Sequence, residues 1–207
     1  MNYIDMPVSE FTAALASSSP APGGGGASAL AAALGAALGC MVGNLTVGKK
    51  KYAGNEPRLR ELIAEAQSLR ERLLALVDAD AEAFLPLAEA YRLPMDAPGR
   101  DAVMEKCLAD AAAVPMEILE LSCRVIALQE EFAALGSSLA VSDAGTGAAF
   151  AWAAMYGAAL NVLVNTRLMA DRECAGDMNR RVNELMQEYR VKASRVYEDV
   201  FAKLSDK

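Results

Sequence analysis

The hydrophobic and polar positions along the chain repeat with helical periodicity. Residues 8–16 place Phe11 and Leu15 on one face and predict a short amphipathic helix. No stretch alternates with the period of two that marks a strand. The sequence therefore predicts an all-α helical bundle, organised as a single domain over residues 1–207. Long helices are expected, in chain order, over residues 27 to about 52, 58–91, 100–135, 143–167 and about 177 to 204.

The segment from Ser17 to Gly26 interrupts this pattern, because it contains two prolines and four consecutive glycines. It is expected to be a loop. A flexible linker is one interpretation. The other is a binding loop, since it opens directly into a long helix whose first N–H groups are free and glycines allow close approach. Further along, Ser142 is expected to cap the helix from Asp143.

Two of the predicted helices carry long uncharged stretches, residues 27–48 and 144–166. Gly35, Gly39 and Gly43 recur every four residues and give the first helix a smooth stripe. Both stretches are rich in Ala and Gly rather than Leu, Ile and Phe, so membrane insertion would be weak. We expect them to be long buried central helices of a soluble protein, with enough apolar surface to predict a homodimer.

The amino-acid composition excludes several classes of partner and of catalytic site. The net charge of −7 argues against a nucleic-acid partner. Histidine is absent, which excludes Ser-His-Asp and Cys-His catalysis and most zinc sites. We expect no metal, and acid–base chemistry falls to Asp, Glu, Lys or Tyr. The N-terminal residues lack the basic segment of a signal peptide, so a cytoplasmic location is expected.

The candidate residues lie in three polar segments. If the glycine-striped helix runs to Tyr52, Lys50 lies near whole turns from Gly39 and Gly43 and emerges on the glycine face. A solvated charge at a helix end is the alternative. Asp78, Asp80 and Glu82 alternate, so at least one must leave the solvent face, although surface charge is the plainer interpretation.

The third segment is the second uncharged helix. Asp143 is the only charged residue between Phe132 and Val164. Asn161 and Asn165 share one face, and buried amides need partners, so they either hold the core together or contact a ligand.

Several motifs resemble one known family. Residues 19–27 read SPAPGGGGA, residues 41–52 read MVGNLTVGKKKY, and residues 78–84 read DADAEAF. Residues 141–145 (VSDAG) and 158–165 (AALNVLVN) follow in the same order. Over nearly the whole chain these segments resemble the formiminotetrahydrofolate cyclodeaminase/methenyltetrahydrofolate cyclohydrolase family.

The resemblance implies an all-helical homodimer without metal or redox cofactor, which binds folate in a groove near the dimer interface. Family members either expel ammonia from formiminotetrahydrofolate or hydrolyse 5,10-methenyltetrahydrofolate to 10-formyltetrahydrofolate. The Lys-Lys-Lys run resembles the stand-alone cyclohydrolases, so hydrolysis is the expected activity, with cyclodeaminase as the alternative. A folate-binding or scaffold protein without turnover is a third hypothesis.

The site expected from these arguments has Lys50, Asp143 and Asp80 as catalytic residues. The expected substrate-binding residues are Lys49, Gly23, Gly24, Gly25, Ser142, Asn161 and Asn165. No cofactor is expected besides the folate substrate, and no nucleic acid or membrane partner. The chain departs from the family at Leu163, where relatives place Arg or Tyr, and at residues 136–140, which lack an Asn-rich sequence.

Overall fold

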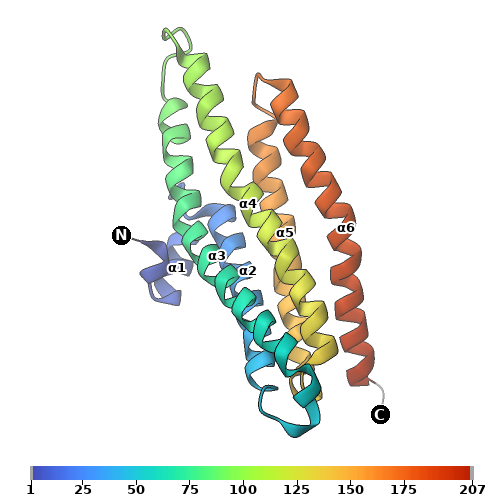
Figure 1. Ribbon diagram of the computed structural model, residues 1–207. Coiled ribbons are helices and arrows are strands. Elements are labelled where there is room, and N and C mark those ends of the chain that lie inside the picture. The colour runs from blue at the N-terminus through green and yellow to red at the C-terminus, as the bar shows by residue number, and fades with distance from the viewer. Residues whose placement is uncertain (1, 206–207) are drawn as a thin grey trace.

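The computed structural model describes residues 2–205, and no strand occurs among them (Figure 1). The all-α prediction is confirmed. The α-helices are α1 (Val8–Leu15), α2 (Gly23–Asn44), α3 (Glu56–Ala90), α4 (Arg100–Leu135), α5 (Val141–Thr166) and α6 (Arg172–Ser205). Three short 3-10 helices are η1 (Tyr3–Asp5), η2 (Lys50–Asn55) and η3 (Ser138–Ala140).

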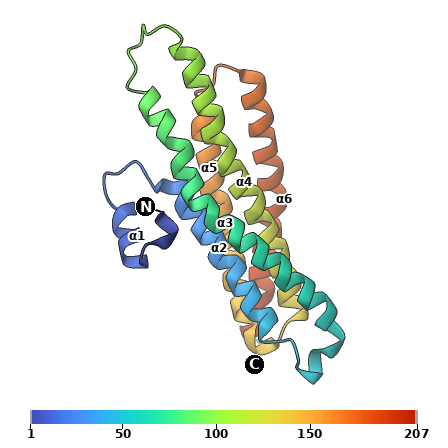
Figure 2. The ribbon, with the colours of Figure 1, turned by 60° about the vertical axis from the view of Figure 1, so that its left-hand side comes forward.

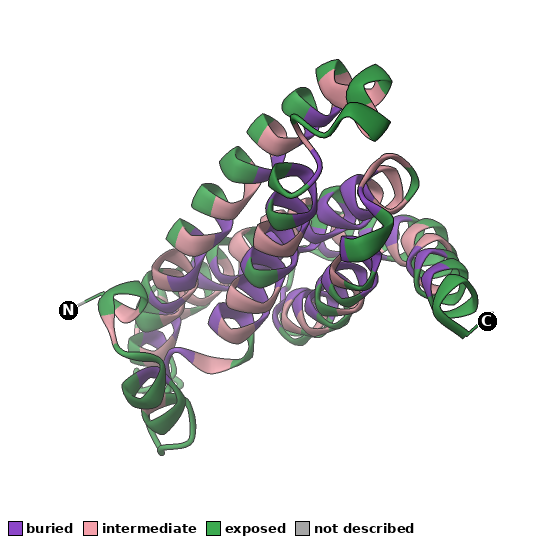
Figure 3. Ribbon diagram, turned by 90° about the horizontal axis from the view of Figure 1, so that it is seen from below, coloured by how far each residue is buried: buried purple, intermediate pink, exposed green. Residues whose placement is uncertain are grey.

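The five long helices form a bundle in which consecutive helices run in opposite directions (Figure 1). α2 packs against α3, α4 and α5, and α6 covers α5 and α4. α1 stands beside α2 and α3 at the edge of the bundle (Figure 2) and inserts Phe11 into the main core. Buried positions face the interior of the bundle and exposed ones face outward (Figure 3).

α2 and α5 approach closely because glycines face each other where they meet. A Cβ built on Gly35 would lie 2.8 Å from the carbonyl oxygen of Gly147. The buried Gln129 of α4 donates from Nε2 to the Gly35 carbonyl oxygen over 2.7 Å. The glycine stripe therefore packs α2 against its neighbours within the same chain.

Two boundaries of α2 differ from the prediction. The helix begins at Gly23, so the four glycines are helical rather than part of the loop. It ends at Asn44 and not near Tyr52, because Gly48 has a φ of 83° that no α-helix accommodates. Lys49 is extended and Lys50 starts η2. The helical-phase argument that placed Lys50 on the glycine face is therefore wrong.

The starts of α5 and α6 also differ from the prediction. Ser142 does not cap α5, because η3 leads directly into the helix and Ala140 occupies the cap position. α6 begins five residues early at Arg172, since Asp171 accepts hydrogen bonds from the backbone N–H groups of Glu173 and Cys174 at 3.1 and 2.9 Å.

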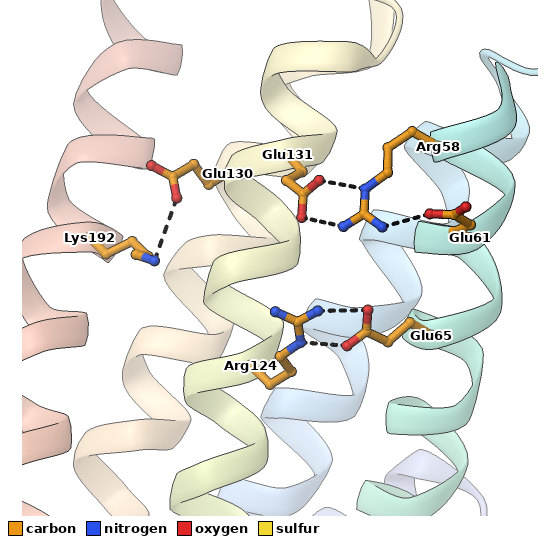
Figure 4. Close-up of polar contacts among 7 residues, drawn as sticks. All are labelled: Arg58, Glu61, Glu65, Arg124, Glu130, Glu131 and Lys192. Atoms are coloured by element: carbon orange, nitrogen blue, oxygen red, sulfur yellow. Dashed lines mark hydrogen bonds and ion pairs between the residues drawn. The ribbon is translucent and has the colours of Figure 1, made fainter. Parts of the chain in front are cut away.

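Ion pairs join the helices on the outside of the bundle (Figure 4). They include Arg58 with Glu131, Arg124 with Glu65, and Lys192 with Glu130. These side chains are partly exposed, so each pair contributes at most about 1 kcal/mol. The guanidinium group of Arg124 could bind an anion, but it is paired with the carboxylate of Glu65.

Gly23–Asn44 and Ser138–Thr166 are long and apolar enough to span a membrane by length and composition alone. In the bundle, 61% and 44% of their most apolar windows are buried. Neither helix is covered on all sides. The large exposed apolar side chains are Leu34 and Met41 on α2, Leu45 directly after it, and Phe150, Tyr156, Leu160 and Val164 on α5.

Candidate active site

A polar pocket of about 150 Å³ lies at the start of α2. It is enclosed by the proline–glycine segment, α3, α4 and the second half of α5. Its lining includes five of the predicted site residues, namely Gly23, Gly24, Asp80, Asn161 and Asn165, together with Pro20, Pro22, Ala81, Phe84, Ala111, Pro115 and Val164. We call it the Asp80 pocket.

The glycines of this segment let α2 start against the pocket. Gly23 has a φ of 61°, in the left-handed region that side chains disfavour. A Cβ on Gly24 would lie 3.1 Å from Asn161 Nδ2, and one on Gly25 would collide with both carboxylate oxygens of Asp80. The first N–H groups of α2 have no helical partners and carry the positive end of the helix dipole. The pocket therefore combines a carboxylate with the backbone N–H groups at the start of α2.

Asp80 is the titratable group of this pocket. Burial raises the pKa of its carboxyl from 3.8 to about 6, and the backbone N–H of Gly26, which favours the ionised form, partly offsets the effect. Near neutral pH the group exchanges between protonated and ionised forms. A carboxylate with this pKa is suited to taking up and releasing protons in catalysis.

Asn161 and Asn165 both line the pocket but have different hydrogen-bond partners. Pro115 has no N–H, so the buried Ala111 carbonyl one turn earlier in α4 lacks its helical partner. Asn165 Nδ2 donates to that carbonyl over 3.0 Å and to the Asn161 carbonyl over 2.9 Å. Asn165 therefore joins α5 to α4. Asn161 donates to the Gly157 carbonyl over 2.8 Å and stands beside Gly24.

Gly25 lies against Asp80, and the four remaining predicted residues lie at the opposite end of α2. Lys49 and Lys50 are exposed, Asp143 is half-buried in the first turn of α5, and Ser142 is exposed. No ion pair joins Lys50 to Asp143 within residues 2–205. We call these four residues, with Lys51, the lysine cluster.

Tyr52, which sequence reasoning did not single out, belongs to the same end. Hydrogen bonds with the side chain and the backbone of Ser138 lower the pKa of its phenol to about 7. The only signal for it in the sequence is its place directly after the three lysines.

Within one chain the predicted site is split. Gly25 touches Asp80, whereas Lys50 follows the end of α2 at Asn44. The 19 residues from Gly25 to Asn44 rise about 28 Å at 1.5 Å per residue. A catalytic group must come within hydrogen-bond reach of the reacting atoms. Asp80 and Lys50 of the same chain therefore cannot act on one substrate atom.

The fold and the pocket define the class of protein: a helical bundle with a half-buried carboxylate and a glycine-rich helix start at one pocket. No three Cys, Asp or Glu side chains gather as metal ligands in the described part of the chain. A family model described as formiminotransferase-cyclodeaminase matches residues 7–184. The chain belongs to this family.

Two relatives match over nearly their whole length, and they are named for different activities. The methenyltetrahydrofolate cyclohydrolase of Methylorubrum extorquens is 38% identical over 202 residues, which cover 96% of this chain and 97% of the relative. The crystal structure of formiminotetrahydrofolate cyclodeaminase from Thermotoga maritima matches with a TM-score of 0.89 and 26% identity, over 97% of this chain and 98% of that one.

The chain also resembles part of a larger enzyme. The formimidoyltransferase-cyclodeaminase of Mus musculus is 33% identical over 199 residues, which cover 94% of this chain but only 37% of the mouse protein. The resemblance to a family of folate enzymes is thus confirmed.

Proposed function

We propose that the chain is a methenyltetrahydrofolate cyclohydrolase, which hydrolyses 5,10-methenyltetrahydrofolate to 10-formyltetrahydrofolate. The observation that carries this proposal is the 38% identity to the Methylorubrum extorquens cyclohydrolase over nearly the whole of both chains. The net charge of −7 fits an enzyme without a nucleic-acid partner. The two long apolar helices are partly buried in the bundle, which fits a cytoplasmic enzyme of one helical domain without a membrane partner.

The reaction needs proton transfer more than it needs an electrophilic cofactor. The methenyl carbon belongs to a cationic amidinium group and is already electrophilic. Water adds to this carbon, the electrons of the C=N bond move to nitrogen, and a base takes one proton from the water. The bond from this carbon to N5 then breaks, N5 takes up a proton, and loss of the hydroxyl proton leaves the formyl group on N10. One proton is released overall.

We assign the base to Asp80, because its pKa of about 6 leaves it ionised at neutral pH yet able to hold a proton. The ionised carboxylate also stabilises the cationic substrate. We assign Lys50, with Asp143 beside it, to deliver the proton to N5. We assign Lys49 to bind the carboxylates of the glutamate tail of the substrate. Gly23, Gly24, Gly25, Ser142 and Asn161 are assigned to substrate contacts. No metal or other cofactor takes part in this scheme.

These assignments require a second copy of the chain. The Asp80 pocket, at about 150 Å³, is smaller than the roughly 300 Å³ at which pockets for drug-sized ligands begin. Its lining residue Val164 is 51% exposed and also belongs to the apolar face of α2 and α5. Because the buried sides of both helices pack on α4, their exposed sides share the opposite side of the bundle.

We therefore propose a homodimer that buries this face with the helices of the two copies antiparallel. A two-fold axis perpendicular to α2 brings the Asp80 pocket of one copy to the lysine cluster of the other. Lys50 of the partner subunit then faces Asp80 across the interface, and each dimer holds two sites. A dimer with parallel helices would leave the two clusters about 28 Å apart.

The proposal is tested by following the near-ultraviolet absorbance of 5,10-methenyltetrahydrofolate with enzyme that has been treated with a chelator. We expect turnover without added metal or nucleotide, and a kcat lowered by roughly two orders of magnitude or more with Asp80→Asn. A strict requirement for a divalent ion contradicts the mechanism. Binding of folate without any turnover contradicts the enzyme assignment.

Cyclodeaminase activity is the second candidate, favoured by the structural match to the Thermotoga maritima enzyme. Closure of formiminotetrahydrofolate with loss of ammonia passes through the same amidinium carbon and needs the same base and acid. Assaying both substrates with one preparation separates the two. A higher kcat/KM on formiminotetrahydrofolate assigns the chain to the cyclodeaminases.

A further inference from the structure

Residues 46–55 contain the three lysines and are here called the lysine segment. Three side chains of this segment, those of Thr46, Tyr52 and Asn55, form hydrogen bonds with the turn that precedes α5. Each uses a side-chain atom on one segment and a backbone group on the other. The bonds are Ser137 N–H to Thr46 Oγ1 at 2.7 Å, Ser138 N–H to Tyr52 Oη at 3.1 Å, and Asn55 Nδ2 to the Leu135 carbonyl at 3.0 Å. The bonded residues are 80 to 91 residues apart in the sequence, so these contacts are tertiary and lie outside any single helix.

We propose that Tyr52 is a positioning residue for the hydrolysis, whose phenol oxygen holds the lysine segment against the start of α5 and so fixes Lys50 relative to Asp143. This inference rests on the proposed function. Tyr52 follows Lys50 by two residues, and Ser138 precedes Asp143 by five residues along η3 and α5. Of the three bonds, this one forms the shortest path between the two predicted catalytic residues.

The surroundings of the phenol favour its ionised form. The Ser138 hydroxyl lies 3.4 Å from Tyr52 Oη, so the oxygen has both a backbone and a side-chain partner. Lys51 Nζ lies 5.3 Å from the ring centroid. On the facing side, residues 132–142 carry no charge, and Asp143 is the first charged group. Glu56 of α3 is bound by Arg60 and by the Gly48 N–H.

Ionisation strengthens the fastening, because a phenolate accepts shorter and stronger hydrogen bonds than a phenol. The pKa of about 7 places this change at neutral pH. Below it the phenol is neutral and the bond to the Ser138 N–H is weaker. Between that pKa and the ordinary value near 10, the folded chain holds a phenolate that the unfolded chain does not. The lysine segment is therefore held more firmly as the pH rises through 7.

The experiment compares Tyr52→Phe with the wild type and with Tyr91→Phe, which alters an exposed tyrosine after α3. The pH profiles of kcat and KM on 5,10-methenyltetrahydrofolate are measured for each. We expect Tyr52→Phe to lower kcat roughly 10- to 100-fold, the scale of misplaced catalytic groups, with KM changed less than about threefold. The step in kcat near pH 7 should be absent from this variant and present in Tyr91→Phe.

A spectroscopic titration without substrate keeps the test independent of activity. The absorbance of phenolate is recorded against pH, and the Tyr52→Phe curve is subtracted from that of the wild type. A midpoint near pH 7 supports the inference, and one near the ordinary pKa of tyrosine overturns it. A wild-type kcat and pH profile in Tyr52→Phe also overturns it. If the wild type turns over neither folate, the proposed function fails, whereas the titration still reports on Tyr52.

Discussion

At the scale of single residues, Asp80 combines two opposing influences. Burial in the pocket favours its protonated form, and the N–H of Gly26 at the start of α2 favours its carboxylate. Burial prevails. The shift from 3.8 to about 6 means that ionising Asp80 in the folded protein costs about 3 kcal/mol more than ionising an exposed carboxyl group. The residue that we assign as the base is therefore a source of instability at neutral pH.

This balance predicts that Asp80→Asn stabilises the fold while lowering the activity. A folded-state pKa above the unfolded one gives stability that is present below pH 4 and lost as the pH rises through 6. The neutral amide removes that loss. At pH 8 the variant should gain up to about 3 kcal/mol in unfolding free energy. At pH 4 the gain should vanish.

Denaturant unfolding at the two pH values measures this effect, with Asp96→Asn in the exposed 91–99 loop as the control that should change nothing. The kcat of Asp80→Asn should fall by roughly two orders of magnitude or more. A variant that is less stable than the wild type at pH 8 contradicts the burial argument, whatever its activity.

Asn165 leads to a second prediction at this scale. Replacing it with Ala leaves the Ala111 carbonyl without a donor, because Pro115 supplies none. We expect Asn165→Ala to lower the unfolding free energy by about 1–3 kcal/mol. Adding Pro115→Ala restores a backbone N–H to that carbonyl, so the double variant should regain part of the loss. A double-mutant cycle measures the coupling; purely additive effects would contradict this role.

The residue types of the site were predictable from the sequence, but their grouping was not. The sequence predicted that at least one of three alternating acids leaves the solvent face, although surface charge was the plainer interpretation, and in the structure Asp80 lines the pocket. Asn165 was left between two roles, because pairing it with the carbonyl freed by Pro115 depends on the packing of α4 against α5. Tyr52 was missed because its partner Ser138 is 86 residues away.

At the scale of helices, the sequence predicted the long elements well and their ends poorly. Periodicity located α3 and α4, since 35 and 36 residues of regular pattern average out local exceptions. Helix ends depend on single residues. Four glycines suggested a loop, yet Gly24 to Gly26 are helical and lie where a side chain would meet Asn161, Asp80 or Val77. Gly48 then stopped the helix that an apolar run seemed to continue.

The glycine stripe of α2 gives a prediction at this scale. A Cβ at Gly39 would lie 2.7 Å from Phe132 Cε2 and 2.8 Å from Gln129 Nε2, both buried. Gly39→Leu should therefore destabilise the fold by at least about 3 kcal/mol. Gly176→Leu on α6 is the matched control, since nothing lies within 4 Å of its Cβ, and a better helix former should stabilise it by about 0.5–1 kcal/mol. Thermal unfolding compares the two, and equal losses would contradict the packing argument.

At the scale of the whole molecule, the antiparallel course of α2 and α5 decides how a site can be assembled. The start of α2 lies beside the end of α5, so Gly24 meets Asn161, and the lysine cluster gathers at the other end. A sequence alone cannot reveal this separation, because motif order says nothing about which helix ends coincide. The exposed apolar face between the two clusters, with Leu160 68% exposed, is the surface on which a second copy can unite them.

The composite site predicts complementation between inactive variants. Lys50→Met and Asp143→Asn should each lower kcat by roughly two orders of magnitude while the dimer stays folded, with Lys106→Met on the exposed side of α4 as the unaffected control. Lys50→Met alters the lysine cluster and Asp80→Asn the pocket, so a mixed dimer has both changes in one site and neither in the other. Unfolding and refolding the two variants together should restore about a quarter of wild-type activity, because half the dimers are mixed and each has one intact site.

Light scattering at micromolar concentration should give the mass of a dimer. Leu160→Glu should shift this mass toward that of a monomer and abolish turnover, because it places an unpaired charge on the face that the dimer buries. If both clusters acted within one chain, mixing would restore nothing and a monomeric variant would remain active. If the dimer paired like ends, the mixture would again stay inactive although the mass was that of a dimer. Recovery of activity on mixing, with its loss in Leu160→Glu, is the outcome that only the antiparallel arrangement produces.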